Sequence, residues 1–233
     1  MNNLWYLSPS NQGGNLGIGN YGTEQDQMIQ LVDEITPHLD RCGVSFHVAE
    51  RSMTLAQKKE ESDRLGAVWY IAFHSNAGGN GQAWGPIAFY AGARDLAERL
   101  ISELLATGQK NNRAANVVKT GDLYEVIQPK AKACLLEVDF HDSQVGVDFL
   151  TNRRHDAAKA IAKAIVAMDG KQWIEEKGAA SAWAYDVTQE AKRIGLFRGD
   201  ESGNYRWQDP ITREEVAAIA IRLKEHILKQ KGG

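Results

Sequence analysis

The chain has 233 residues, of which 43% are hydrophobic and 24% are charged, which is ordinary for a globular protein. Its formal net charge is -3 and its basic residues are scattered among acidic ones, so we expect no nucleic-acid partner. No segment approaches the ~20 apolar residues that a membrane span needs, so we expect no membrane partner either.

The N-terminal segment MNNLWYLSPSNQ has neither the basic start nor the long apolar core of a signal peptide. We therefore expect a protein that is made in the cytoplasm without a signal peptide. Cys42 and Cys134 lie far apart in the sequence, each in an apolar context, and are interpreted as buried thiols.

Strand-like and helix-like segments alternate over the first ~165 residues, which predicts an α/β domain. Apolar runs predict strands at 4–7, 44–48, 68–73, 86–90 and 133–138. Helical spacing of apolar residues predicts helices after position 23 and at 54–65, 95–106 and 155–168. The polar region 111–132 predicts a loop with one short strand or helix.

The first of these helices carries signals at both ends. Thr23 is a suitable N-cap, because its hydroxyl can accept a hydrogen bond from a backbone amide of the first turn. Pro37 removes one helical hydrogen bond and is expected to kink the helix or to mark its end.

Composition predicts two domains. Residues 1–170 form the main domain, and 171–182 form a linker with few apolar residues. Residues 183–233 form a small helical module of two helices, the second opened by Thr212 and Glu215 as a capping box. Because so short a segment has a small core, we expect it to dock on the main domain or to self-associate into a homo-oligomer.

Three titratable residues lie beside buried apolar runs. His74 ends an apolar strand and precedes a Gly-rich loop, at the edge where ligand sites of open α/β sheets gather. Glu137 lies inside the apolar strand ACLLEV, where a carboxylate has to be paired, protonated or near a metal. Glu24 begins a helix after a Gly-rich loop. One histidine and two carboxylates approach what a hydrolytic zinc site requires.

Plainer interpretations stand beside this one. His74 is also consistent with a core histidine satisfied by hydrogen bonds. Glu24 is also consistent with a carboxylate stabilised by the helix dipole. The convergence of the three residues on one sheet edge favours a site.

The strings YLSPSNQGGN, NYGTE, FHSNAGG and LLEVDFHD extend this argument. Over residues 3–168 the chain resembles a divergent branch of the zinc-dependent N-acetylmuramoyl-L-alanine amidases, the family of autolysins, spore-associated enzymes and phage endolysins. The resemblance implies a single twisted, mostly parallel sheet flanked by helices, with the small helical module added. It also implies hydrolysis of the amide between N-acetylmuramic acid and L-alanine of peptidoglycan, with Zn2+ as cofactor.

The resemblance also implies roles for single residues. Glu24 and His74 match metal ligands, and Glu137 matches the catalytic general base and acid. The family's first ligand, a histidine after the first strand, is replaced here by the turn Ser10-Asn11-Gln12. Either His141 supplies the missing imidazole, which we favour if the strand continues that far, or Asn11 or Gln12 coordinates through an amide oxygen. A third alternative is loose or absent metal binding.

Position alone makes Asn11, Gln12 and Asn76 candidates for binding the glycan or the stem peptide. Asn15 and the loops around Gly78 and Trp84 are further candidates.

The C-terminal segment resembles a single S-layer homology repeat. The resemblance is carried by Trp183, Ala184, Gly195, Gly199 and the string Ile211-Thr212-Arg213-Glu214. It implies that Thr212 and Arg213 bind an anionic secondary cell-wall polysaccharide. A helical appendage that stabilises or oligomerises the enzyme is the competing interpretation.

These patterns predict a peptidoglycan hydrolase of the bacterial cell wall, an endolysin or autolysin. Two alternatives stay open: a noncatalytic wall-binding protein on a degenerate amidase scaffold, and another zinc peptidase that acts on stem peptides.

Overall fold

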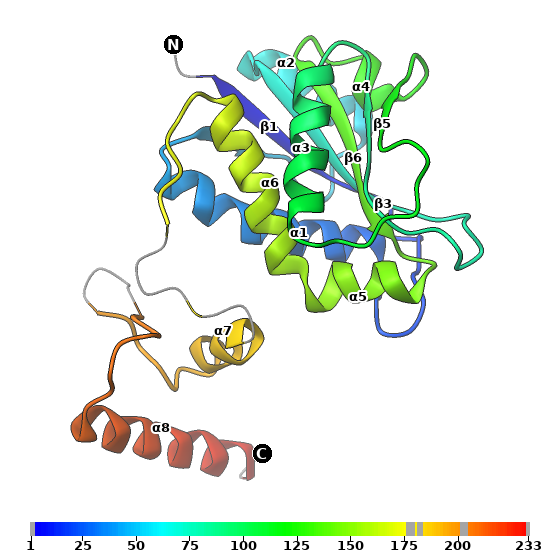
Figure 1. Cartoon of the computed structure of the whole chain (residues 1–233). Helices are drawn as coiled ribbons and strands as arrows, with labels where there is room; N and C mark the ends of the chain where they lie inside the picture. Colours follow the sequence, from blue (N-terminus) through cyan, green and yellow to red (C-terminus); the bar gives the residue numbers. More distant parts are fainter. Residues whose placement is uncertain (1–2, 176–179, 181–183, 201–204, 232–233) are drawn as a thin grey trace. The chain divides into compact units, whose positions relative to one another are not determined.

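The computed structural model describes residues 3–175, 180, 184–200 and 205–231 (Figure 1). The chain divides into two compact units, residues 1–174 and 175–233, and the division falls inside the segment predicted as a linker. Much of that segment, with Trp183, lies outside the described residues. No helix in the described part of the chain is long and apolar enough to cross a membrane.

Six strands of the described residues form one sheet in the order β2-β1-β3-β6-β4-β5. The strands are β1 (Leu4–Pro9), β2 (Ser45–Val48), β3 (Trp69–Asn76), β4 (Ile87–Tyr90), β5 (Val117–Lys119) and β6 (Lys132–Phe140). All neighbours are parallel except β4 and β6, which are antiparallel. The predicted mostly parallel α/β sheet is therefore confirmed.

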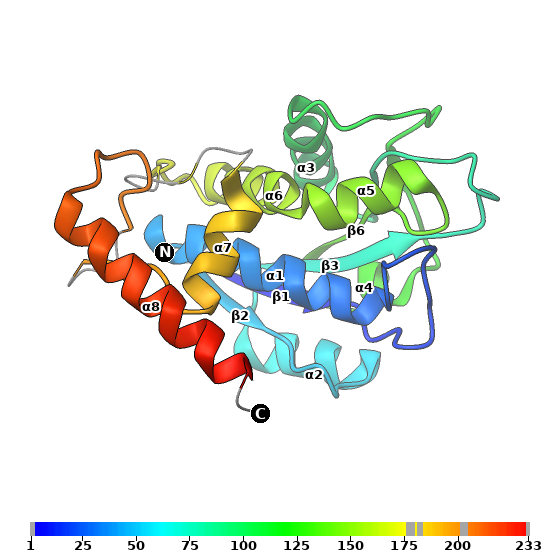
Figure 2. The same ribbon diagram turned by 90° about the horizontal axis from the view of Figure 1, so that it is seen from below.

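Helices of the first unit cover both faces of this sheet. They are α1 (Glu24–Arg41), α2 (Leu55–Leu65), α3 (Arg94–Ala106), α4 (Tyr124–Ile127), α5 (Gln144–Asn152) and α6 (Arg154–Met168). Figure 2 shows α3 and α6 on one side of the strands and α2 on the other. The second unit contains α7 (Tyr185–Arg193) and α8 (Arg213–Lys231).

Alternation along the strands builds two cores. Leu7, Ile71 and Phe73 point to the face covered by α1, α3 and α6, and are fully buried there. Tyr6, Tyr70 and Ala72 point to the other face and form a smaller core with residues near α4. Successive side chains of a strand point to opposite faces of the sheet, so two adjacent residues at a strand end lie on different faces.

Helix α1 confirms the predicted N-cap and excludes one of the two outcomes expected for Pro37. The Thr23 hydroxyl accepts a hydrogen bond from the Asp26 amide at 3.1 Å, so Thr23 is the N-cap. Pro37 does not end the helix, which continues to Arg41. The carbonyl of Asp33, which a proline cannot bond, accepts instead from the Thr36 hydroxyl at 3.4 Å.

Candidate functional site

The carboxyl ends of β1, β3 and β6 lie side by side, because the three strands are parallel neighbours. Pro9 of β1 pairs with Phe73 of β3, and His74 of β3 pairs with Glu137 of β6. Since paired residues of parallel strands point to the same face, the side chains of His74 and Glu137 are neighbours. The loop that follows β1 leads into α1 and brings Glu24 to this edge.

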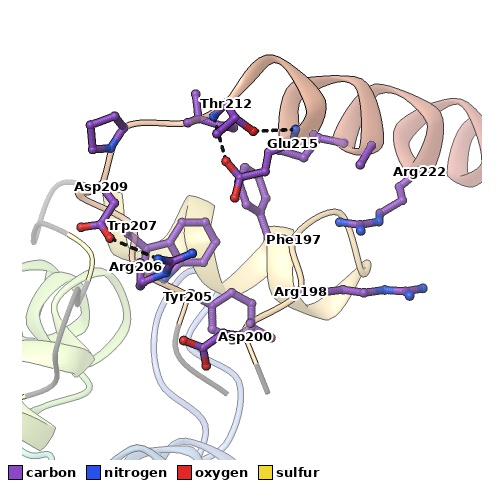
Figure 3. Close-up of a pocket in the computed structure, with 15 residues that line it drawn as sticks. Phe197, Arg198, Asp200, Tyr205, Arg206, Trp207, Asp209, Thr212, Glu215 and Arg222 are labelled. Atoms are coloured by element: carbon purple, nitrogen blue, oxygen red, sulfur yellow. Dashed lines mark hydrogen bonds and ion pairs between the residues drawn. The ribbon is translucent and has the colours of Figure 1, made fainter. Parts of the chain in front are cut away.

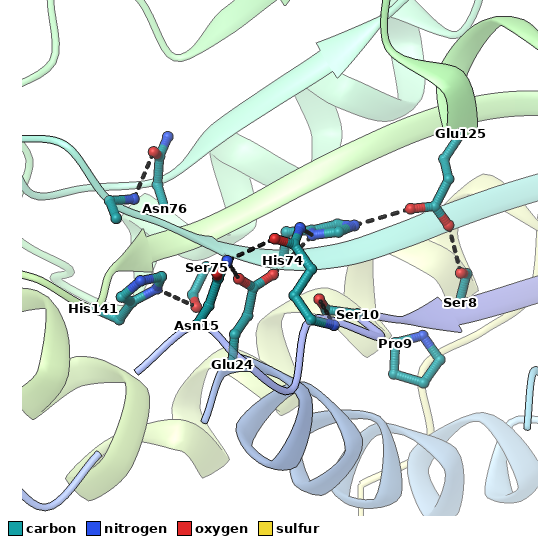
Figure 4. A network of polar contacts seen from close by, with 12 residues as sticks. Ser8, Pro9, Ser10, Asn15, Glu24, His74, Ser75, Asn76, Glu125 and His141 are labelled. Carbon is teal, nitrogen blue, oxygen red and sulfur yellow. Dashed lines mark hydrogen bonds and ion pairs between the residues drawn. The ribbon is translucent and has the colours of Figure 1, made fainter. Parts of the chain in front are cut away.

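His74 is held by a carboxylate at each ring nitrogen (Figure 4). Its Nδ1 lies 2.8 Å from Glu24 Oε1, and its Nε2 lies 3.0 Å from Glu125 Oε2. The residue is only 6% exposed. Burial alone would lower its pKa, but the hydrogen bonds to Glu125 and Glu24 outweigh burial and raise the pKa to about 10.

Glu24 is buried at the first residue of α1 and takes part in this network. Its Oε2 accepts a hydrogen bond from Asn15 Nδ2 at 2.8 Å. Burial would raise the pKa of Glu24, but hydrogen bonds from His74, Ser10 and Asn15 lower it. Glu24 therefore lies at a helix N-terminus, where the helix dipole stabilises an anion, and also contacts His74.

Glu137 differs from the other carboxylates of the site in its hydrogen bonding. Its Oε2 is buried and has no hydrogen-bond partner among the described residues. Burial raises the pKa of Glu137 to about 7, the positive charge of His74 opposes the rise, and the negative charge of Glu24 adds to it. A carboxyl group with this pKa can exchange a proton near neutral pH, which suits a general base and acid.

Glu125 is a site residue that the sequence analysis did not identify. It lies on the one-turn helix α4 and is 4% exposed. It belongs to the polar region 111–132, where a single turn gives no apolar periodicity. Its contact with His74 completes a row in which the imidazole of His74 lies between the carboxylates of Glu24 and Glu125.

His141 does not join this row. Its Nδ1 lies 2.8 Å from Ser75 Oγ, and its ring stacks on Tyr21 with centroids 5.5 Å apart. The preference for His141 assumed that the strand alternation continues beyond Glu137. Instead, β6 ends at Phe140 and carries one extra residue, because His74 pairs with Glu137 but Asn76 pairs with Phe140. This bulge shifts the alternation by one, and His141 meets Ser75, which follows His74 and points to the opposite face.

Gln12 is the residue of the substituted turn that reaches the network. Its Nε2 lies 3.3 Å from His74 Nδ1, and its Oε1 accepts from Asn15 Nδ2 at 2.6 Å. Asn11 instead donates to the carbonyl of Met53 at 3.1 Å. The Oδ1 of Asn76 accepts from the Ala77 amide at 2.7 Å, at the rim of the same edge. The structure thus brings Gln12, and not Asn11, beside Glu24 and His74.

The side chains at this site supply some, but not all, of the ligands that a metal ion needs. Glu24 and His74 present a carboxylate oxygen and an imidazole nitrogen to each other, both of which zinc accepts. Across the described residues, no three His, Cys, Asp or Glu side chains gather around one point where a metal ion would fit. A third protein donor at this position would come from the Gln12 amide.

The second unit contains a pocket of about 680 Å³ (Figure 3). Phe197, Tyr205 and Trp207 contribute aromatic walls, and Arg222 and Thr212 contribute polar groups. The predicted capping box is confirmed, because Thr212 N donates to Glu215 Oε2 at 2.8 Å and Glu215 N donates to Thr212 Oγ1 at 3.1 Å. Arg213 is exposed and opens α8 next to this pocket.

Solved structures of amidases share the fold. The catalytic domain of CwlV, an N-acetylmuramoyl-L-alanine amidase from Bacillus (Paenibacillus) polymyxa var. colistinus, superposes with a TM-score of 0.62 at 15% identity. The alignment covers 73% of this chain and 99% of that domain. An N-acetylmuramoyl-L-alanine amidase from Clostridium difficile 630 has a TM-score of 0.64 at 15% identity, covering 71% of this chain and 96% of that one.

A third structure is the CwlD amidase from Clostridioides difficile in complex with the GerS lipoprotein. It has a TM-score of 0.59 at 18% identity, with 71% of this chain and 98% of that chain covered. No curated protein sequence matches the chain. A model of the Amidase_3 family, described as N-acetylmuramoyl-L-alanine amidase, matches residues 8–167. Since this match spans β1 to α6 and more than half of the chain, the chain belongs to the N-acetylmuramoyl-L-alanine amidase family.

Proposed function

We propose that this protein hydrolyses the amide bond between N-acetylmuramic acid and L-alanine in peptidoglycan. The observation that carries the proposal is the Glu137 carboxyl group opposite His74, with a pKa raised to about 7 and one buried oxygen without a partner among the described residues. Such a group can take a proton from an attacking water molecule and deliver it to the leaving nitrogen of alanine. The lactyl carbonyl carbon gains the water oxygen, and the carbon–nitrogen bond breaks.

We propose zinc as the cofactor, held by Glu24 and His74 and by Gln12 through its amide oxygen. When bound, the ion would lower the pKa of a water molecule and polarise the scissile carbonyl. Asn11 and Asn76 are proposed to contact the glycan or the stem peptide from the rim, as expected from their positions in the sequence. Hydrogen bonds lower the pKa of Glu24 and keep its carboxylate negatively charged, which suits the binding of a cation.

The experiment is a digestion of purified Gram-positive cell walls, with zinc supplied and with a chelator. We expect new N-terminal alanine without new reducing sugars, and a loss of release on chelation. New N-termini other than alanine would instead indicate a peptidase that acts on stem peptides. Retained wall binding without any release would indicate a noncatalytic binder and would contradict the proposal.

For the second unit we propose binding of an anionic wall polysaccharide through Thr212 and Arg213. Support comes from the exposed Arg213 beside a pocket with aromatic walls and Arg222. Such a unit would bring the enzyme to the wall as an autolysin or endolysin. The test compares sedimentation of wild type and Arg213→Ala with intact walls and with walls stripped of polysaccharide. Equal sedimentation of the two proteins with intact walls would contradict this role and favour an assembly role.

A further inference from the structure

Glu125 lies at the centre of a buried hydrogen-bond network. Its Oε1 lies 2.7 Å from Ser8 Oγ, and its Oε2 lies 3.0 Å from His74 Nε2 (Figure 4). Oε1 also lies 2.7 Å from the Tyr70 hydroxyl. Ser8 and Tyr70 are fully buried. A buried carboxylate is stable only when its oxygens are well bonded, and here both are.

The chemistry of these groups fixes where the protons lie. An ionised carboxylate only accepts hydrogen bonds, so Ser8, Tyr70 and His74 Nε2 must all donate to Glu125. His74 therefore carries a proton on Nε2, and Nδ1 is the nitrogen that faces Glu24 and Gln12.

We propose that Glu125 is a positioning residue that keeps Nε2 of His74 protonated and so leaves Nδ1 as the nitrogen that faces the site shared with Glu24. This inference rests on the proposed function, because a histidine that binds a metal through one nitrogen needs its other N–H held by an acceptor. Glu125 contacts Nε2, the ring nitrogen that does not face Glu24, so it affects the site only through His74.

A second network in the same unit gives a matched control. Glu61 Oε2 lies 2.8 Å from the Tyr6 hydroxyl and 3.0 Å from His47 Nε2, so a tyrosine, a glutamate and a histidine meet there too. The His47 side chain is 38% exposed and lies on the edge strand β2. An effect of Glu125 that is specific to the site should be absent when Glu61 is changed in the same way.

The test is Glu125→Gln, read by 15N NMR of histidine-labelled protein and by zinc titration. The glutamine oxygen can still accept from Ser8 and Tyr70, so its amide N–H would point at His74 Nε2, which then has to accept. We expect Nε2 of His74 to lose its proton, so that the ring keeps a proton on Nδ1 only, and zinc affinity to fall about 10–100-fold. Glu61→Gln should leave the His74 signals and zinc affinity unchanged.

An unprotonated Nε2 on His74 in the wild-type protein would overturn the inference, and this spectrum needs no variant to fold. Unchanged His74 signals in a folded Glu125→Gln protein would overturn it as well. The NMR readout does not depend on cleavage of cell walls. A protein that shows the expected proton shift but releases no alanine would therefore contradict the proposed function and leave the role of Glu125 intact.

Discussion

His74 on β3 and Glu137 on β6 occupy opposite positions in the register of two parallel strands. The backbone hydrogen bonds of the sheet, rather than a side-chain contact, set this spacing. A proton acceptor and an imidazole are therefore held together by two neighbouring inner strands of the sheet.

Glu137→Gln should abolish alanine release while leaving the fold intact. The amide has nearly the shape of the carboxyl group but cannot take a proton from water, so the rate should fall about 100-fold or more. Release of N-terminal alanine and a circular dichroism melt check the two parts of this prediction. Activity near that of wild type would exclude Glu137 as the base.

The same substitution should change how stability depends on pH in the chelated protein. The pKa of Glu137 is raised from its ordinary value of 4.5 to about 7, so the native state holds more protons than the unfolded state between these values. This group's contribution to stability is thus present below pH 4.5 and is lost as pH rises through about 7.

We expect wild type to lose on the order of 3 kcal/mol relative to Glu137→Gln between pH 4.5 and 8. Urea unfolding curves of both proteins at the two pH values measure the difference. Glu98→Gln, at an exposed position of α3, is the control, and its free energy of unfolding should change with pH as that of wild type does. Parallel curves for Glu137→Gln and wild type would contradict the raised pKa.

Gln12→His should tighten zinc binding at least about tenfold, because an imidazole is a better zinc ligand than an amide. Gln12 already lies beside His74, whereas Asn11 points to the Met53 carbonyl. Asn11→His is therefore the matched control and should bring no gain. Competition with a chromophoric chelator measures both affinities. A gain for Asn11→His alone would show that the loop is arranged differently around the metal.

His141→Ala should leave zinc affinity within about twofold of wild type but lower the free energy of unfolding by about 1–3 kcal/mol. The reason is that His141 contacts Ser75 and Tyr21 rather than Glu24 or His74. Zinc titration and urea unfolding of the variant test the two statements separately. A large loss of zinc affinity in a folded variant would restore His141 as the third ligand.

Gly146→Ala should destabilise the fold by about 1–3 kcal/mol. An added Cβ would overlap the carbonyl oxygen of Phe140, which is backbone and cannot turn away. Gly92→Ala is the control, because nothing lies within 4 Å of the Cβ it would gain. Thermal melts of the two variants measure the contrast, and equal melting temperatures would show that α5 can move off β6 at no cost.

The sequence predicted the parts of the fold that long apolar runs and caps encode. The run VWYIAF predicted β3 and placed His74 at its end, and Thr23 predicted the start of α1. These signals are local, because burial on both faces makes a parallel strand uniformly apolar. His74 and Glu137 stand out against such strands, and Glu24 stands out because it begins the helix that Thr23 caps.

Other parts had weak local signals. The region 111–132, predicted as a loop with one short strand or helix, contains both the three-residue strand β5 and the four-residue helix α4, which are too short for a periodicity to appear. Helix α5 begins directly after β6 and was not predicted. Glu125 was missed because its role depends on Ser8, Tyr70 and His74, which are distant in the sequence and adjacent only in the sheet.

The extra residue in β6 between Glu137 and Phe140 decides the surroundings of the second histidine. In a regular strand of the same length His141, four residues after Glu137, would share the face of Glu137 and His74. The bulge moves it to the other face, where its ring stacks on Tyr21. Backbone register, with no change in side-chain chemistry, thus keeps this imidazole out of the carboxylate cluster around His74.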